Sequence, residues 1–298
     1  MRIDVHQHLW PEPFLDALRS RRTPPRLVGW DLELPGERPF AVDPAHHDPE
    51  RRDDGDATQV LVAPSAALGL DRLAPDESAR LFGAWLDGAL ALPAPFRAWA
   101  GAGSVEPDPA TLREALDRGA VGLELAADVL AAPGGLDHVA PLLDVLDAAG
   151  RPLLVHPGPA GAAGGPGRPA WWAPVVPYVA QLHAAWWAWI AEGRARHPRL
   201  PVCFVALAGL GPLHGERQRA RGGDGGAIDP LTFVETSSYG MLAVDSVIRV
   251  LGIDVVCHGS DRPYAAPPRL SLGAAALQAL DSVNPGRLLA HVPQEVYA

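Results

Sequence analysis

The stretch RIDVHQH at residues 2–8 is the first of eight short apolar runs that are bounded by turn residues. Such runs are typical of β-strands, which we expect at 2–8, 58–63, 96–103, 120–125, 151–156, 200–207, 231–236 and 253–259. Helical patterns separate most of them, and we expect helices at 76–91, 108–118, 137–149 and 174–197, with Asp76 and Asp108 as the first two N-caps. Strands that alternate with helices predict a single-domain (β/α)₈ barrel, for which about 250 residues is typical.

The segments between the strands also bear on the architecture. A doubly wound sheet would share the alternation, but no G-x-G-x-x-G follows any strand, which disfavours a dinucleotide-binding version. Residues 20–57 lack periodicity, so we expect an irregular insertion that covers part of the barrel mouth. The Pro/Gly-rich stretch at 157–170 directly follows a strand, so we interpret it as a long loop over the C-terminal face.

The composition excludes several classes of protein. Of the 298 residues, 48% are hydrophobic and 20% are charged, which allows a sizeable core and excludes a mostly disordered chain. All 25 basic residues are arginine, which excludes a Schiff-base lysine, a phosphate-binding P-loop lysine and a carboxylated lysine between two metals. The net charge of −10 disfavours nucleic acid as a partner.

The cysteines and the N-terminus indicate a cytoplasmic protein. Cys203 and Cys257 lie far apart in apolar runs, where we expect buried free thiols that suit a reducing compartment. The first residues form no apolar signal segment, and no run approaches the roughly 20 apolar residues of a membrane span. We therefore expect a small-molecule substrate as the partner, and neither a membrane nor a nucleic acid.

The first strand ends in two histidines that share one side of the strand. Side chains alternate across a strand, so Asp4, His6 and His8 are expected to point to the same side. Two imidazoles in this arrangement can bind one divalent metal ion at the end of a barrel strand. His156 ends the fifth strand and Asp261 follows the eighth, so they could supply the third and fourth ligands. Asp261 could also accept a proton from a water bound to the ion.

Three motifs at these positions resemble the amidohydrolase superfamily. They are Asp-x-His-x-His at 4–8, His-Pro-Gly at 156–158 and Gly-Ser-Asp-x-Pro-Tyr at 259–264, and they span the chain from the first strand to the last. The branch that the chain most resembles is the amidohydrolase 2 group, which is similar to aminocarboxymuconate semialdehyde decarboxylase. The resemblance implies a distorted (β/α)₈ barrel, a tendency to form homodimers, and hydrolase or non-oxidative decarboxylase activity. It also implies one divalent ion, often zinc, bound by His6, His8, His156 and Asp261.

The sixth strand departs from the family pattern. Relatives usually carry a histidine there, in a His-x-Gly-Gly-x-x-Pro pattern, whereas this chain has Ala206 in the segment ALAGLGP at 206–212. An alanine cannot transfer a proton, so another residue takes over, or the chemistry differs, or the protein is not catalytic. His214 in the following loop is the best-placed substitute, and His258 is a second candidate that we expect to point out of the barrel. For both histidines, a structural role is the simpler interpretation.

Other residues could line or modify the site. Glu124 on the fourth strand is either the analogue of a residue that bridges two metals in some superfamily members, or a glutamate at the exposed end of the strand. Arg262 could pair with a substrate carboxylate, although a surface or structural ion pair is the simpler assignment. We expect His46-His47-Asp48 to be a solvated turn. Aromatic side chains in predicted loops could form an apolar substrate wall, namely Trp10, Trp171, Trp172 and Tyr264.

These observations favour the metal-dependent hydrolysis of a small organic molecule such as an amide or a lactone. A zinc ion would activate a water molecule, with Asp261 as proton acceptor and His214 as the acid–base candidate. The alternative is non-oxidative decarboxylation of an aromatic or unsaturated acid, which Arg262 and an aromatic pocket would favour. A third interpretation, motivated by Ala206, is a non-catalytic barrel that binds a metal or another ligand.

Overall fold

All eight predicted strand regions contain β-structure in the computed structural model, which describes residues 2–50, 57–161, 167–225, 228–266 and 269–290. The strands of these eight regions pair in parallel, as in a barrel. One sheet has the order β1 (Ile3–His8), β5 (Gln59–Ala63) and β6 (Phe96–Ala98). The other has the order β7 (Ala100–Gly101), β8 (Leu123–Ala126), β9 (Leu153–His156), β10 (Val202–Phe204), β11 (Thr232–Glu235) and β12 (Val256–Cys257).

Backbone hydrogen bonds link the two sheets on both sides. β6 and β7 are separated only by Trp99, and the backbone N–H of Val121, just before β8, donates to the carbonyl of Ala98 on β6 at 2.8 Å. On the other side, the N–H of Val5 on β1 donates to the carbonyl of His258 at 3.0 Å, and the N–H of His8 donates to that of Arg262 at 2.7 Å. The first strand therefore lies beside the segment that follows the last one, as the predicted barrel requires.

Helices separate the strands along the chain. Their bounds are α1 (Glu12–Arg19), α2 (Pro75–Leu90), α3 (Pro109–Asp117), α4 (Ala127–Ala131), α5 (Gly135–Ala149), α6 (Trp172–Val175), α7 (Pro177–Ala188), α8 (Arg194–Arg196), α9 (Gly215–Arg219), α10 (Met241–Leu251), α11 (Ala274–Gln278) and α12 (Asn284–Leu288). The predicted helix at 174–197 is divided, because α6 ends before Pro177 and a π-helical turn at Trp189–Gly193 joins α7 to α8.

The two predicted N-caps have different outcomes. Asp108 caps α3 and accepts a hydrogen bond from the N–H of Ala110 at 2.8 Å. The prediction for Asp76 was wrong, because α2 begins one residue earlier and Ala74 is its N-cap. Pro75 occupies the first helical position, where the missing N–H of proline costs no hydrogen bond.

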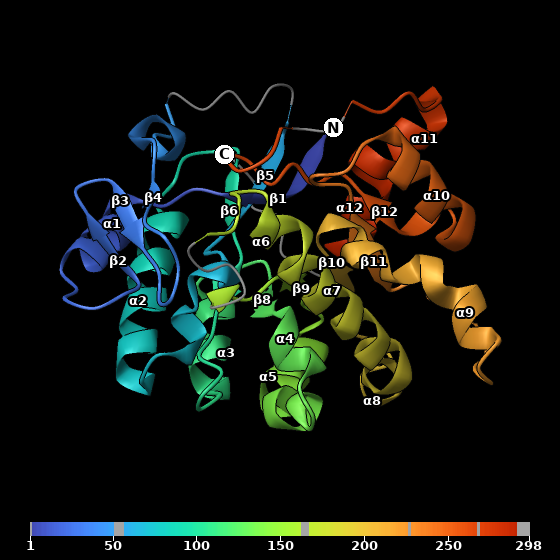
Figure 1. The fold of residues 1–298 in the computed structure, drawn as a ribbon, viewed down its shortest axis with the longest axis horizontal. Coiled ribbons are helices and arrows are strands. Elements are labelled where there is room, and N and C mark those ends of the chain that lie inside the picture. Colours follow the sequence, from blue (N-terminus) through green and yellow to red (C-terminus); the bar gives the residue numbers. More distant parts are fainter. Residues whose placement is uncertain (1, 51–56, 162–166, 226–227, 267–268, 291–298) are drawn as a thin grey trace.

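The insertion at 20–57 is more regular than predicted. It contains a small antiparallel sheet of β2 (Arg26–Val28), β3 (Asp31–Glu33) and β4 (Phe40–Ala41), which lies beside α1 and α2 at one edge of the molecule (Figure 1). Strands of two or three residues are too short to show an alternating pattern, which explains the wrong prediction. Residues 51–56 of the insertion and 162–166 of the predicted loop at 157–170 lie outside the described residues.

The core is apolar and contains both cysteines. Cys203 and Cys257 are buried and free, as predicted, and burial raises the pKa of both thiols well above its ordinary value. No helix in the described ranges is long and apolar enough to cross a membrane. The largest fully buried side chains include Trp10, Trp85, Trp99, Trp189, Phe14, Phe204 and Phe233.

Candidate metal centre

Three histidines and an aspartate converge at the C-terminal ends of the strands. His6 and His8 lie on β1, His156 ends β9, and Asp261 follows β12, where its N–H donates to the carbonyl of His6 at 2.9 Å. One ligand atom from each of the four residues lies within 4.8 Å of those of the other three. The Nε2 atoms of His6 and His8 are 3.1 Å apart, and Oδ1 of Asp261 lies 3.2 Å from Nε2 of His8. The sequence therefore predicted a cluster that the fold does bring together.

The Nδ1 atoms of the three histidines all face acceptors. His8 donates to the carbonyl of Ala63 at 3.1 Å and His156 to the carbonyl of Pro157 at 2.9 Å. Because a carbonyl oxygen only accepts, Nδ1 must carry the proton in both rings. Nε2 of each neutral ring then presents a lone pair to the cluster.

This donor set fits a divalent ion. The Nε2 atoms of His6 and His8 lie 3.1 Å apart, close enough for both to bind one cation once His6 has lost its proton. Burial lowers the pKa of His8, and burial together with the charges of the other two histidines lowers that of His156, so both rings favour the neutral ligand form. Burial alone would raise the pKa of Asp261, but the contact with Nε2 of His8 and the charges of the nearby imidazoles lower it, which favours the carboxylate.

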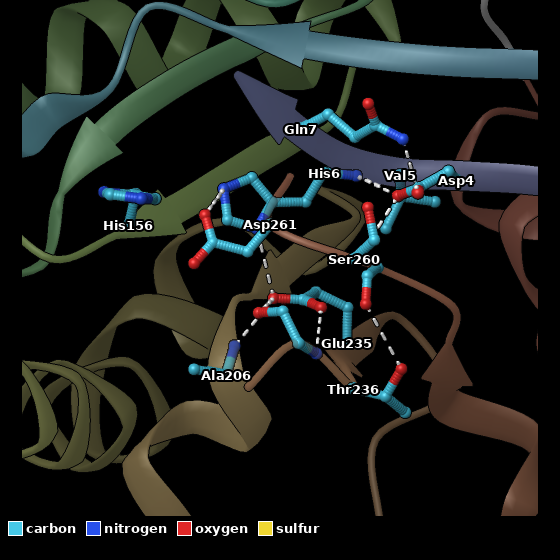
Figure 2. A network of polar contacts seen from close by, with 12 residues as sticks. Asp4, Val5, His6, Gln7, His156, Ala206, Glu235, Thr236, Ser260 and Asp261 are labelled. Atoms are coloured by element: carbon cyan, nitrogen blue, oxygen red, sulfur yellow. Dashed lines mark hydrogen bonds and ion pairs between the residues drawn. The ribbon is translucent and has the colours of Figure 1, made fainter. Parts of the chain in front are cut away.

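His6 differs from the other two histidines because its Nδ1 faces a carboxylate. Nδ1 lies 3.3 Å from Oε1 of Glu235, the last residue of β11 (Figure 2). Burial would lower the pKa of His6, but the hydrogen bond to Glu235 and the charges of Asp261 and Glu235 outweigh it and raise the pKa to about 9. Without a metal ion, His6 is therefore protonated at neutral pH.

Asp4 does not join the cluster, although it shares its strand with His6 and His8. Its Oδ1 accepts hydrogen bonds from the N–H groups of His6 at 3.2 Å and Ser260 at 3.1 Å, and its Oδ2 accepts one from Nε2 of Gln7 at 2.8 Å (Figure 2). Asp4 thus ties β1 to the segment that carries Asp261.

Glu124 is buried, which contradicts the interpretation that it lies at the exposed end of its strand. Its side chain is 1% exposed, and the backbone N–H groups of Ser65 and Ala66 donate to it. Its Oε1 has no hydrogen-bond partner among the described residues and lies 3.9 Å from Nδ1 of His156, beyond hydrogen-bond distance. Burial raises the pKa of Glu124 to about 7.

Ala206 begins a left-handed turn directly after β10. The φ angles of Ala206, Leu207, Ala208 and Leu210 lie between 47° and 61°, a region that costs roughly 1–2 kcal/mol for each residue other than glycine. Such strain persists only where neighbouring groups enforce it, and it is common at functional sites. Here the N–H of Ala206 donates to Oε1 of Glu235 at 2.7 Å.

The two histidines considered as substitutes lie in different surroundings. His214 is exposed, and its ring packs edge-on against that of His183 on α7, with the centroids 4.8 Å apart. His258 is buried, and its Nε2 lies 3.2 Å from a guanidinium nitrogen of Arg2 and 3.7 Å from Oδ2 of Asp4. These contacts give His258 a structural role.

The aromatic residues predicted at the mouth fall into two groups. Tyr264 is 44% exposed, and its ring centroid lies 5.4 Å from that of His8 and 6.4 Å from that of Phe40 in the insertion. Trp10 is fully buried, so the expectation that it lines an exposed substrate wall was wrong; its ring stacks on that of His47 at 4.4 Å and lies 6.5 Å from that of Tyr264. The expectation of a solvated turn at His46-His47-Asp48 was therefore wrong for His47, which the insertion folds against Trp10.

Trp171 and Arg262 were also predicted to bind substrate. Trp171 is 57% exposed in the segment before α6, and its ring lies 5.7 Å from that of Trp172. Arg262 is half-buried, and its backbone pairs with Gln7 of β1.

Comparison with known proteins gives matches by structure only. No family model and no curated protein matches the sequence. IDCase from Metarhizium anisopliae in its apo form matches with a TM-score of 0.75 and 14% identity over 98% of this chain and 97% of that one. A 5-carboxyvanillate decarboxylase from Novosphingobium aromaticivorans, complexed with manganese and 4-hydroxy-3-methoxy-5-nitrobenzoic acid, matches with a TM-score of 0.69 and 15% identity over 97% and 96%. An amidohydrolase II matches with a TM-score of 0.71 and 16% identity over 97% and 100%.

At these identities the likeness shows the fold. The barrel implied by the resemblance to the amidohydrolase superfamily is therefore confirmed over nearly the whole chain.

Proposed function

We propose that the chain is a metal-dependent decarboxylase of a small carboxylic acid and a member of the amidohydrolase 2 group. The observation that carries the proposal is the cluster of three imidazole nitrogens and one carboxylate oxygen at the strand ends. Among the compared structures, the 5-carboxyvanillate decarboxylase supports decarboxylation over the hydrolysis that we preferred from the sequence. The decarboxylase alternative therefore becomes our main proposal.

The metal ion would be held by His6, His8, His156 and Asp261. When bound, it would fix the substrate carboxylate and polarise it, which is the Lewis-acid chemistry of a divalent ion. We propose zinc as the ion, because a mixture of imidazole and carboxylate ligands suits it. One of the compared decarboxylases contains manganese instead.

The residues of the chain would have to deliver one proton to the substrate. When the C–C bond breaks, CO₂ leaves and the electron pair stays on the substrate carbon, which must then accept a proton. Asp261 is the proposed carrier, because it lies at the cluster and its second oxygen remains available when Oδ1 faces His8. As a carboxylate it would first take up a proton from solvent and then pass it to the substrate carbon. His214 remains the second candidate, but its exposed position beside His183 makes Asp261 the stronger assignment.

An aromatic or unsaturated acid would suit the wall beside the cluster. Tyr264 lies next to His8 and Phe40 lies next to Tyr264, and both rings are partly exposed, so they could pack against a planar substrate. Trp171 and Arg262 remain proposed substrate-binding residues, with Arg262 as the partner of a second carboxylate or of another anionic group on the substrate.

Release of CO₂ tests the proposal directly. The purified protein would be stripped of metal with a chelator, reloaded with Zn²⁺ or Mn²⁺, and incubated with aromatic and unsaturated acids, and with amides and lactones in parallel. We expect CO₂ release that requires the ion. Hydrolysis without CO₂ release would restore the first interpretation, whereas metal binding without either reaction would favour the non-catalytic barrel that Ala206 suggested.

A further inference from the structure

Glu235 is a buried carboxylate that contacts several strands around the candidate metal centre. It is 0% exposed, and its Oε1 faces Nδ1 of His6 on β1 and accepts from the N–H of Ala206 after β10 at 2.7 Å. The hydroxyl of Ser237 donates to Oε1 at 2.5 Å, and the N–H of the same residue donates to Oε2 at 2.6 Å. One side chain thus joins elements that lie far apart in the sequence.

The surroundings of Glu235 select a carboxylate. All four groups that face its oxygens are donors when Nδ1 of His6 carries a proton, and a carboxylate is the side chain that only accepts. A glutamine would turn its amide NH₂ towards at least one of these donors. The segment before Asp261 also makes room for the carboxylate, because a Cβ at Gly259 would lie 2.1 Å from Oε2 of Glu235.

We propose that Glu235 is a positioning residue for the metal centre, which fixes the ring of His6 and anchors the left-handed turn at 206–210 through one carboxylate oxygen. This inference rests on the proposed metal centre. A carboxylate behind a histidine ligand keeps the proton on Nδ1 and aims Nε2 at the ion. Because Oε1 also accepts the N–H of Ala206, displacement of Glu235 would disturb the His6 ring and the turn together.

Glu235→Gln is the decisive variant, and Ser237→Ala is its matched control. The serine variant removes one donor to the same carboxylate but leaves the contacts with His6 and Ala206 in place. The affinity for Zn²⁺ would be measured by competition with a chromophoric chelator. We expect about 10–100-fold weaker binding in Glu235→Gln, the typical effect of losing such a partner, and less than about threefold in Ser237→Ala.

Proton NMR of the histidine side chains supplies a readout that does not need the metal. The hydrogen-bonded Nδ1 proton of His6, identified by its loss in His6→Asn, should resonate far downfield in the metal-free wild type and in Ser237→Ala. It should be lost or shifted upfield in Glu235→Gln. A wild type that binds no zinc would refute the metal centre, yet this resonance would still report whether Glu235 holds His6.

Two outcomes would overturn the inference. One is a Glu235→Gln protein that keeps wild-type zinc affinity and the His6 resonance but unfolds more easily, because this would reduce Glu235 to a structural residue. If that variant does not fold, Glu235→Asp retains the charge but is one methylene shorter, and we expect it to bind zinc more weakly than the wild type. The second outcome that would overturn the inference is a Glu235→Asp protein with wild-type zinc affinity and an unchanged His6 resonance.

Discussion

Replacing Glu124 by glutamine should stabilise the metal-free protein at alkaline pH. The side chain is buried next to His156, and one of its oxygens has no hydrogen-bond partner among the described residues. Burying an unpaired negative charge is unfavourable, which is why the pKa of Glu124 rises from 4.5 to about 7. Glutamine has nearly the same shape, and its carbonyl oxygen can still accept from the N–H groups of Ser65 and Ala66.

The magnitude follows from the two pKa values. A group whose pKa is raised on folding costs no stability below its unfolded pKa, and its full cost is reached above its folded pKa. For Glu124 the cost grows between pH 4.5 and about pH 7, and each pH unit is worth about 1.4 kcal/mol. The wild type therefore loses about 3 kcal/mol across this range through Glu124, and the glutamine variant does not.

Urea denaturation of chelator-treated protein at pH 5 and pH 8 would measure this difference. We expect Glu124→Gln to raise the free energy of unfolding by about 2–3 kcal/mol at pH 8 and to change it little at pH 5. Glu106→Gln, at an exposed position, serves as the control and should show no such dependence on pH. Added zinc should reduce the gain, because a nearby cation offsets the cost of the charged glutamate. Equal effects at both pH values, or destabilisation at pH 8, would refute the reasoning.

Three further predictions concern the proposed metal centre and its chemistry. Since the pKa of His6 is about 9 without a metal, zinc must displace a proton from His6 at neutral pH. Competition titrations should therefore show a zinc affinity that rises by up to about tenfold per pH unit from pH 7 to pH 9 and is constant above pH 9, and an affinity that does not change with pH would contradict this. Asp261→Asn should lower turnover by at least about a hundredfold while zinc binding remains measurable, because an amide oxygen can bind the ion but the amide cannot carry the proton. Near-normal CO₂ release by this variant would mean that another residue transfers the proton. His214→Ala should reduce turnover by less than about tenfold if Asp261 carries the proton, and a loss of a hundredfold or more in kinetic assays would return the acid–base role to His214.

The strands could be predicted because parallel barrel strands are buried on both faces and therefore read as continuous apolar runs. The strand ends were harder to place. The run at 200–207 stops being a strand at Phe204, since the next segment enters the left-handed turn that begins at Ala206. The run at 253–259 retains only Val256–Cys257 as strand, because Ile253–Val255 form a 3₁₀ turn. Apolar content identifies a buried segment, but it does not report the φ angles that end a strand.

The site could be predicted only where its residues have distinctive chemistry. His6, His8 and His156 stand at the ends of apolar strands, and histidines at that position of a barrel point to a metal. Glu235 ends an apolar strand in the same way, but a single glutamate there predicts nothing until its neighbours are known. Those neighbours come from other strands, and the same is true of Trp10, which is covered by a histidine from the insertion.

Glu235 also explains how the centre can keep its geometry when the sixth strand carries Ala206. The turn at this position is held through the backbone N–H of Ala206 and not through its side chain, so the side chain can change while the anchor remains. The same carboxylate oxygen faces His6, and therefore the ligand set does not depend on a histidine at position 206. Compared with the family pattern that the motifs resemble, Ala206 leaves the sixth strand without a proton-transferring side chain, while the four candidate ligands are in place, which is why a test of the chemistry must concentrate on Asp261.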